Sequence, residues 1–168
     1  MRRRLLGSVS AFAVLVLATG CGGGGDDAAT GLADDATVTY TFRDASVPPP
    51  FHRSVTLTVA RDTSRIVIDS YGDVLADTSV ATPPDVWTEL GTSIDEISRL
   101  TPSPPGEGCT GGTGRSVTVV SGTQTLADVD VEFCANSNAG LDSAMDAWIK
   151  PARDLFPSTE ELAPPDKG

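Results

Sequence analysis

The segment Thr37-Val-Thr-Tyr-Thr-Phe42 decides the fold class, because polar and apolar residues alternate strictly along it. Successive side chains of a β-strand point to opposite faces, so Val38, Tyr40 and Phe42 predict a buried face and the threonines predict a solvated one. The same alternation returns in Arg53-Ser-Val-Thr-Leu-Thr-Val59. Strands that are apolar on one side only are typical of an antiparallel sheet with one face toward water.

The strand pattern extends outward from these two segments along most of the chain. Further strands are predicted at 65–69, 74–81, 116–120 and 124–133. The connections among the first four strands are short, which favours an antiparallel meander.

Two other segments have the period of an amphipathic helix. The first begins at Thr82-Pro83-Pro84-Asp85, which supplies an N-cap, a proline and an acid, and its apolar residues recur as far as Leu100. Gly91-Thr92-Ser93 leaves open whether this segment is one helix or two. The second helix starts near Leu141, and Pro151 is expected to kink or restart it. Its apolar face consists of Met145, Trp148, Ile149, Ala152 and Leu155.

The resulting order is ββββ-α-ββ-α, which predicts an α+β fold with an antiparallel sheet and helices packed on one face. Residues 37–157 are expected to form the single domain, and residues 158–168 a loose C-terminal tail. The segment 21–36 is rich in Gly and Asp and has no apolar period, so it predicts a flexible tether.

Residues 1–21 have the features of an export signal. Arg2-Arg3-Arg4 precedes an apolar stretch at 11–18 that is too short to span the roughly 30 Å of hydrocarbon in a bilayer. Leu17-Ala18-Thr19-Gly20-Cys21 resembles the lipobox of bacterial lipoproteins. The resemblance implies a signal peptide at 1–20, fatty acyl chains such as palmitate on Cys21, and a lipid anchor on the extracytoplasmic side of a bacterial cell membrane. Ordinary secretory cleavage that leaves a free thiol is the alternative.

The charge of the chain excludes several classes of function. The 168 residues include 12 basic and 23 acidic ones, for a net charge of −11, and loss of residues 1–20 removes three arginines and no acid, which leaves −14. So acidic a chain does not suit a nucleic-acid partner, nor electrostatic adhesion to an anionic membrane. One His and two remaining Cys do not supply the usual zinc ligands, and no metal or cofactor is predicted.

Cys109 and Cys134 remain in the exported part of the chain. In an oxidising compartment a disulfide is the default state of such a pair. The bridge would close a loop of about 26 residues and contribute roughly 3.5 kcal/mol in the chain-entropy model. The predicted pairing implies that the segments around the two cysteines lie side by side.

The segment Pro48-Pro-Pro-Phe-His-Arg-Ser54 is the most distinctive candidate site. Its prolines restrict the backbone, and Phe51, His52 and Arg53 could form a binding loop. The alternative is a plain strand connection in which Phe51 packs onto the domain. A nucleophile pair of Ser54 and His52 is also conceivable, but it requires an orienting acid and an oxyanion hole that the sequence does not place. No catalytic residue is therefore assigned.

Three further segments have a functional and a structural interpretation. The Gly-rich segment 108–115 matches neither phosphate-binding loop pattern, so we favour a sharp turn beside the disulfide over an anion-binding nest that includes Arg115. Asp69-Ser-Tyr-Gly-Asp73 is interpreted as a turn, because it lacks the ligand spacing of a calcium loop. One strand face carries acids that suit either solvent or weak binding of a divalent cation; these are Asp128, Asp130 and Glu132.

Taken together, the segments 48–54, 69–76 and 108–113 resemble a set of small bacterial envelope lipoproteins. The resemblance covers most of 37–157, agrees with a single disulfide-containing domain and brings no activity with it. The scarcity of nucleophile–base pairs and metal ligands favours binding over catalysis. We therefore expect a lipid-anchored, non-catalytic binding module whose partner is an envelope protein, such as a protease that it inhibits, or a small ligand. An envelope hydrolase using His52 and a purely structural envelope component are the alternatives.

Overall fold

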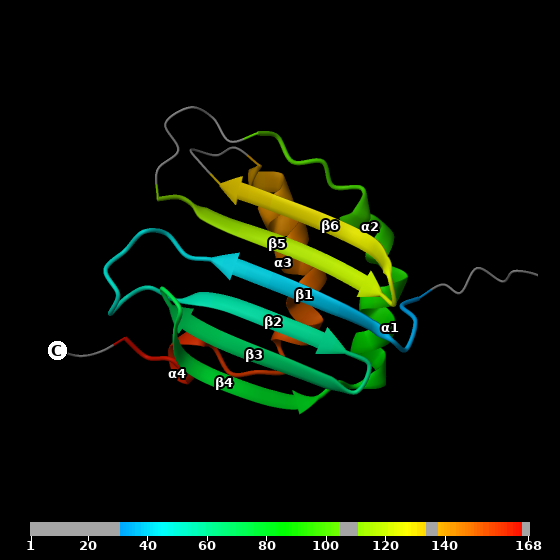
Figure 1. The fold of residues 1–168 in the computed structure, drawn as a ribbon, viewed down its shortest axis with the longest axis horizontal. Coiled ribbons are helices and arrows are strands. Elements are labelled where there is room, and N and C mark those ends of the chain that lie inside the picture. Colours follow the sequence, from blue (N-terminus) through cyan, green and yellow to red (C-terminus); the bar gives the residue numbers. More distant parts are fainter. Residues whose placement is uncertain (1–30, 105–110, 134–137, 166–168) are drawn as a thin grey trace, which may run out of the picture.

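The structure is a computed structural model that describes residues 31–104, 111–133 and 138–165. Its elements are β1 (Ala36–Arg43), β2 (Ser54–Ala60), β3 (Thr63–Ser70), β4 (Asp73–Ala81), α1 (Pro84–Thr92), α2 (Ile94–Ser98), β5 (Thr113–Ser121), β6 (Gln124–Phe133), α3 (Ala139–Arg153) and α4 (Thr159–Leu162). The six strands form one sheet in the order β4-β3-β2-β1-β5-β6, and every neighbouring pair is antiparallel (Figure 1). The predicted α+β class, the antiparallel sheet and the meander of the first four strands are confirmed.

The strand register turns the sequence alternation into two different sheet faces. On one face Tyr40 lies opposite Leu57 of β2 and Val117 of β5, and this apolar row is buried. On the other face Thr39 lies opposite Thr58 and Thr118. Because α1, α2 and α3 all lie behind the sheet in Figure 1, the helices cover the apolar face and leave the threonine face uncovered.

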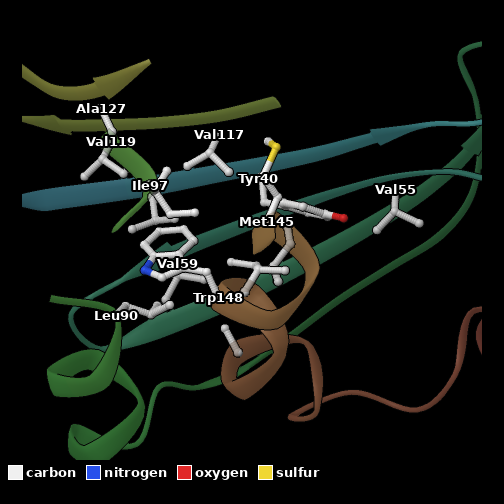
Figure 2. Packing of buried hydrophobic residues seen from close by; sticks show 14 of the residues in the cluster. Tyr40, Val55, Val59, Leu90, Ile97, Val117, Val119, Ala127, Met145 and Trp148 are labelled. Atoms are coloured by element: carbon white, nitrogen blue, oxygen red, sulfur yellow. The ribbon is translucent and has the colours of Figure 1, made fainter. Parts of the chain in front are cut away.

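The core lies between the apolar face of the sheet and the helices. Figure 2 shows Leu90 of α1, Ile97 of α2 and Met145 and Trp148 of α3 directed toward the sheet residues. Three of these four side chains are at most 1% exposed, and Trp148 is 6% exposed. Burial of one such side chain contributes about 1.5–3 kcal/mol, so the helices are held mainly by this apolar contact.

The helical segment after β4 is divided into two helices, which answers the question that the sequence left open. The break falls at Ser93, between α1 and α2. Gly91 is buried just before the break, where a Cβ atom would lie 2.5 Å from the backbone nitrogen of Leu32. The absence of a side chain on Gly91 therefore lets the chain that precedes β1 pass close against α1.

This close contact contradicts part of the predicted tether, because its last residues belong to the folded domain. Leu32 is only 9% exposed and belongs to the core, and Ala36 already starts β1. Asp34 and Asp35 accept hydrogen bonds from Arg61 and Ser121. Residues 31–36 are therefore part of the domain, and residues 21–30 of the predicted tether lie outside the described part.

The prediction of a loose tail is also wrong for the segment 158–165. Ser158 and Glu161 form a capping box that starts α4, in which each side chain accepts from the backbone N–H of the other residue. Ala163 is 4% exposed. Arg53 donates to the backbone oxygens of Ala163 at 2.8 Å and of Pro164 at 2.9 Å, and so fastens this segment to the start of β2.

Pro151 does not restart the last predicted helix, because α3 continues through it as far as Arg153. A proline this close to a helix end removes only one hydrogen bond of the last turn. Four of the five residues predicted for the apolar face are buried, namely Met145, Trp148, Ile149 and Ala152. The fifth, Leu155, lies beyond the end of α3 and is only partly buried.

Both cysteines of the predicted disulfide, Cys109 and Cys134, lie outside the described residues, as do Cys21 and the predicted signal peptide. The described strand ends that flank them, Thr113 and Phe133, pair at one end of the β5–β6 hairpin. Because neither cysteine is among the described residues, the disulfide stays a prediction. Among the described residues, no helix has the length and apolar character needed to cross a bilayer.

Candidate functional site

The predicted binding loop connects β1 to β2 at one end of the sheet. Phe51 and His52 donate backbone hydrogen bonds to the carbonyl oxygen of Pro48, at 2.9 and 3.2 Å, which closes a turn. Asp44 fixes the ends of the loop, since its carboxylate accepts from the backbone nitrogen of Arg53 at 2.8 Å and its own N–H donates to the Ser54 hydroxyl at 3.1 Å. The loop is therefore held in one conformation by its own hydrogen bonds.

A second segment, the β3–β4 turn, is tied to this loop. The Ser70 hydroxyl donates to the carbonyl oxygen of Pro49 at 2.9 Å, and the Tyr71 hydroxyl donates to that of Val47 at 2.6 Å. The rings of His52 and Tyr71 are stacked, with centroids 3.9 Å apart. Tyr71 has a φ of +54°, an unusual value for a non-glycine residue, and these contacts hold it there.

The loop, the turn and the first residues of β4 carry all the exposed large hydrophobic residues in the described part of the chain. The exposed fraction is 61% for Phe51, 56% for Tyr71, 62% for Val74 and 42% for Leu75. We call these four residues the loop-end surface. In Figure 1 the loop and the turn lie at the same end of the strands, and the segment that precedes β1 enters at the other end. The interpretation in which Phe51 packs down onto the domain is therefore wrong.

The other two residues of the predicted binding loop, His52 and Arg53, are less exposed than Phe51. His52 is 5% exposed, and its Nε2 lies 3.5 Å from the Ser54 hydroxyl oxygen. Its Nδ1 is buried and has no hydrogen-bond partner among the described residues. The nucleophile pair considered above thus has its hydroxyl, but the described residues supply no acid to orient the imidazole. Arg53 instead fastens the C-terminal segment.

Beside the loop-end surface, two pockets lie on the apolar face of the sheet, between β1, β2, α3 and α4. Their volumes are about 360 and 340 Å³. Phe42, Val55 and Thr159 line both pockets, so the two pockets are adjacent. We call the two pockets together the α3–α4 groove. Phe51 lines its outer part, which connects the groove to the loop-end surface.

A cluster of polar residues closes the α3 side of the groove. The Tyr40 hydroxyl donates to Asp146 at 3.0 Å and accepts from Arg115. Arg115 also pairs with Asp142 and with both carboxylate oxygens of Asp146, the latter at 2.9 and 3.0 Å. Its guanidinium carbon lies 4.9 Å from the centroid of the Phe42 ring, which is within the range of a cation–π contact.

The environment of this cluster changes the titration of two of its members. Burial of the hydroxyl raises the pKa of Tyr40 well above its ordinary value, and the positive charge of Arg115 opposes this effect only in part. Burial disfavours the charge of Arg115, but its hydrogen bond to Asp142 and the neighbouring acidic groups outweigh this and raise the pKa of the guanidinium. The cluster thus consists of a neutral phenol beside a permanently charged arginine that pairs with carboxylates. Its hydrogen bonds and ion pairs join β1, β5 and α3.

This cluster was not anticipated from the sequence. Tyr40 was expected only as a core residue and Arg115 only as part of a Gly-rich nest, whereas Arg115 reaches α3. One signal was available, because Asp142 and Asp146 are four residues apart and therefore share one side of the predicted helix, next to its apolar face.

The basic residues of the described part differ in how their charge is balanced. Six of the eight pair with a carboxylate; they are Arg43, Arg61, Arg65, Arg99, Arg115 and Lys150. Arg53 and Arg153 have no such pair among the described residues. Arg153 donates to the carbonyl oxygens of Phe156 and Pro157 and to the Thr159 hydroxyl, all of them neutral. Both arginines line the α3–α4 groove.

Each of the remaining candidate segments contains a residue with a structural contact. Asp69 accepts from the backbone nitrogen of Gly72 at 2.9 Å within the β3–β4 turn. Asp130 forms a two-point ion pair with Arg43, with distances of 2.7 and 3.1 Å. At Gly114 a Cβ atom would lie 2.5 Å from the guanidinium of Arg43, so this glycine makes room for that side chain. In the part of the chain that is described, no three His, Cys, Asp or Glu residues converge as metal ligands would.

Comparison with known proteins adds no family to this geometry: no model of a known protein family matches the chain, and no curated protein matches it either.

Proposed function

We propose that the chain is a lipid-anchored, extracytoplasmic binding module that contacts an envelope protein through the loop-end surface. The sequence supports the anchor through the basic start, the short apolar stretch and the lipobox-like segment that ends in Cys21. The observation that supports the binding role is that the exposed large hydrophobic residues of the described part all lie at one end of the sheet. Phe51 is on the loop, Tyr71 is on the turn that is hydrogen-bonded to it, and Val74 and Leu75 follow at the start of β4. Exposed apolar groups gathered in this way are characteristic of interaction sites.

The rigidity of this surface favours binding without a large entropic cost. Side chains held on a preformed backbone lose less freedom on association than those on a flexible loop. Here the Tyr71 hydroxyl and the Ser70 hydroxyl both hold the loop, and the His52 ring stacks beneath Tyr71. Aromatic residues presented on such a support are frequent energetic centres of protein interfaces.

The position of the surface fits an anchored protein. The chain enters the domain at the far end of β1, whose eight residues span about 27 Å at roughly 3.4 Å per residue. An anchor attached before residue 31 therefore leaves the loop-end surface accessible to a partner. Asp69 and Asp73 flank the β3–β4 turn, so the matching partner surface has an apolar centre and a basic rim.

Two experiments test this function. Mass spectrometry of the mature N-terminus is expected to find Cys21 as the first residue with attached acyl chains, and an unmodified N-terminus elsewhere would refute the anchor. Cross-linking in envelope preparations is expected to give one specific adduct with the natural chain. The double variant Phe51→Ser, Val74→Ser is expected to lose that adduct.

The matched control carries Thr123→Ser and Gln124→Ser, which are exposed and lie at the β5–β6 turn, on the opposite end of the strands. This control variant is expected to cross-link as the natural chain does. Equal cross-linking of the Phe51→Ser, Val74→Ser variant would refute the proposed contact surface.

The hydrolase that uses His52 has less support. The Ser54 hydroxyl lies within reach of the imidazole, but the described residues provide neither an acid at Nδ1 nor an open site, since the ring lies under Tyr71. Loss of a hydrolytic activity in a His52→Asn variant with unchanged folding would favour this alternative over the binding module.

A further inference from the structure

A further pocket lies among the helices, where α1 ends and α2 begins against α3. We call it the helix-junction pocket. Its volume of about 350 Å³ is within the roughly 300–1,000 Å³ that ligand pockets occupy. Its lining consists of Glu89, Thr92, Ser93, Glu96 and Ile97 from the α1–α2 segment and Ala144, Ala147 and Trp148 from α3. None of these residues belongs to the loop-end surface, so the pocket is separate from the proposed protein contact.

The helix-junction pocket is a consequence of the break between α1 and α2 and of small side chains on α3. The break falls at Ser93, which ends α1 and precedes α2. Ile97 and Trp148 are directed toward the sheet in Figure 2 and are 1% and 6% exposed, so they form the apolar base of the pocket. Ala144 and Ala147 stand on the α3 side, and their single methyl groups leave the space between the helices open.

The charge of this lining has one sign only. Glu89 and Glu96 are exposed and pair with no basic residue of the described part, and the lining contains no Lys, Arg or His. The next basic residue along the chain, Arg99, already pairs with Asp95 at 2.6 Å. The α3–α4 groove, in contrast, is lined by acidic and basic residues together. The helix-junction pocket therefore favours a cationic ligand.

The polar side chains of the lining also favour a ligand that donates hydrogen bonds. The hydroxyls of Thr92 and Ser93 donate to the carbonyl oxygen of Glu89, at 3.1 and 2.7 Å, so their oxygens remain as acceptors. Trp148 supplies one buried donor, because its Nε1 has no hydrogen-bond partner among the described residues. Figure 2 shows this nitrogen on the side of the ring toward Leu90 of α1. Such a buried donor is normally satisfied, and an acceptor on a ligand would satisfy it.

We propose that the helix-junction pocket binds a short aliphatic amine. The ammonium group lies at Glu89 and Glu96, and the hydrocarbon chain lies against Ala144 and Ala147. A metal ion fits less well, because hard cations take six or more oxygen ligands, and the described residues bring no three candidate ligands together. The inference goes beyond the proposed protein contact, and neither depends on the other.

The test compares end groups of different charge on one chain length. The probes are hexylamine, hexanol, hexanoate, hexamethylenediamine and aminohexanol. The protein is the full exported chain 21–168 with Cys21→Ser, so that no lipid is attached. Calorimetric titration at low ionic strength is expected to show one saturable site for hexylamine, with affinity at least about fivefold higher than for hexanol. Hexanoate is expected not to bind, because its carboxylate would meet two others.

Variants separate the local charge of the pocket from the acidity of the whole domain. The double variant Glu89→Gln, Glu96→Gln is expected to bind hexylamine no more tightly than hexanol, and to leave hexanol binding unchanged. The matched control is Glu132→Gln, Glu160→Gln, which removes two exposed glutamates that lie outside this pocket, and it is expected to keep the preference for hexylamine. Ala144→Phe fills the pocket from α3 and is expected to block all binding.

Four results would overturn the proposal. They are equal affinities of the natural chain for hexylamine and hexanol, a preference that survives Glu89→Gln, Glu96→Gln, and a preference that the control variant also loses. The fourth is absence of saturable binding of hexylamine and hexamethylenediamine at about 1 mM, the weak end of specific recognition.

The last two probes distinguish the kinds of amine. Tighter binding of hexamethylenediamine than of hexylamine assigns a diamine, whose two charges match the two carboxylates. Tighter binding of aminohexanol assigns an amino alcohol, whose oxygen accepts from the Trp148 indole. Equal binding of all three assigns a simple amine.

Discussion

Replacement of Gly91 by alanine tests the packing of the chain before β1 against α1. The added Cβ atom would lie 2.5 Å from the backbone nitrogen of Leu32 and 2.9 Å from the Cα atom of Gly31. Both neighbours are backbone atoms, so no side-chain rotation relieves the contact, and the segment must move away from α1. That movement exposes Leu32, which is 9% exposed in the native state.

The magnitude follows from two opposing contributions. Loss of the burial of one leucine costs about 1.5–3 kcal/mol. Exchange of glycine for alanine in a helix returns up to about 1 kcal/mol. The expected net loss for Gly91→Ala is therefore about 1–2 kcal/mol, which corresponds to a fall of several degrees in Tm for a domain of this size.

Thermal unfolding followed by circular dichroism measures this loss. Gly140→Ala is the matched control, since Gly140 lies in α3 and nothing is within 4 Å of its added Cβ atom; it is expected to keep or raise the Tm. A chain that starts at residue 34 lacks the opposing segment, so there Gly91→Ala is expected to be stabilising. A loss of the same size in the shortened chain would refute the reasoning.

The remaining predictions concern titration, the C-terminal clamp and the cysteines. Because burial raises the pKa of Tyr40, the native state keeps a proton that the unfolded state loses, so stability is expected to fall as the pH rises above about 10. Urea unfolding at several pH values checks this, and Tyr40→Phe should remove the dependence where Tyr71→Phe does not. Arg53→Gln is expected to free the C-terminal segment, since it removes the donors to two backbone oxygens; faster trimming by carboxypeptidase would be the readout, and unchanged trimming would contradict the clamp. Non-reducing peptide mapping of the exported chain is expected to find Cys109 linked to Cys134, and two free thiols would contradict the predicted disulfide.

The domain boundaries predicted from the sequence were wrong at both ends, for reasons that particular residues show. Leu32 and Ala163 stand in segments rich in Gly, Asp or Pro, and local composition gave no reason to place them in the core. Both positions depend on residues far away in the sequence. Gly91 leaves room for the backbone of Leu32, and Arg53 donates a hydrogen bond to the backbone oxygen of Ala163. The Ser158–Glu161 spacing is that of a capping box, so the start of α4 was available from the sequence.

The candidate site was predictable to a similar extent. The exposure of Phe51 was among the two interpretations of the proline-rich loop, but its grouping with Val74 and Leu75 was not, because the β3–β4 turn is about 20 residues away along the chain. The groove could not be predicted at all, since it depends on where α3 ends above the sheet.

By itself, the sequence determined which side chains of β1 and β2 are buried, where α1, α2 and α3 lie and how acidic the domain is, because these properties depend on neighbouring residues or on composition. Only the tertiary structure decided that β5 pairs with β1, and that Arg115 therefore meets Tyr40 and Asp146, which are 75 and 31 residues away. Strand alternation fixes a buried face but leaves the choice of neighbouring strand open. That choice depends on how the helices after β4 return the chain across the sheet, which is a property of the whole fold.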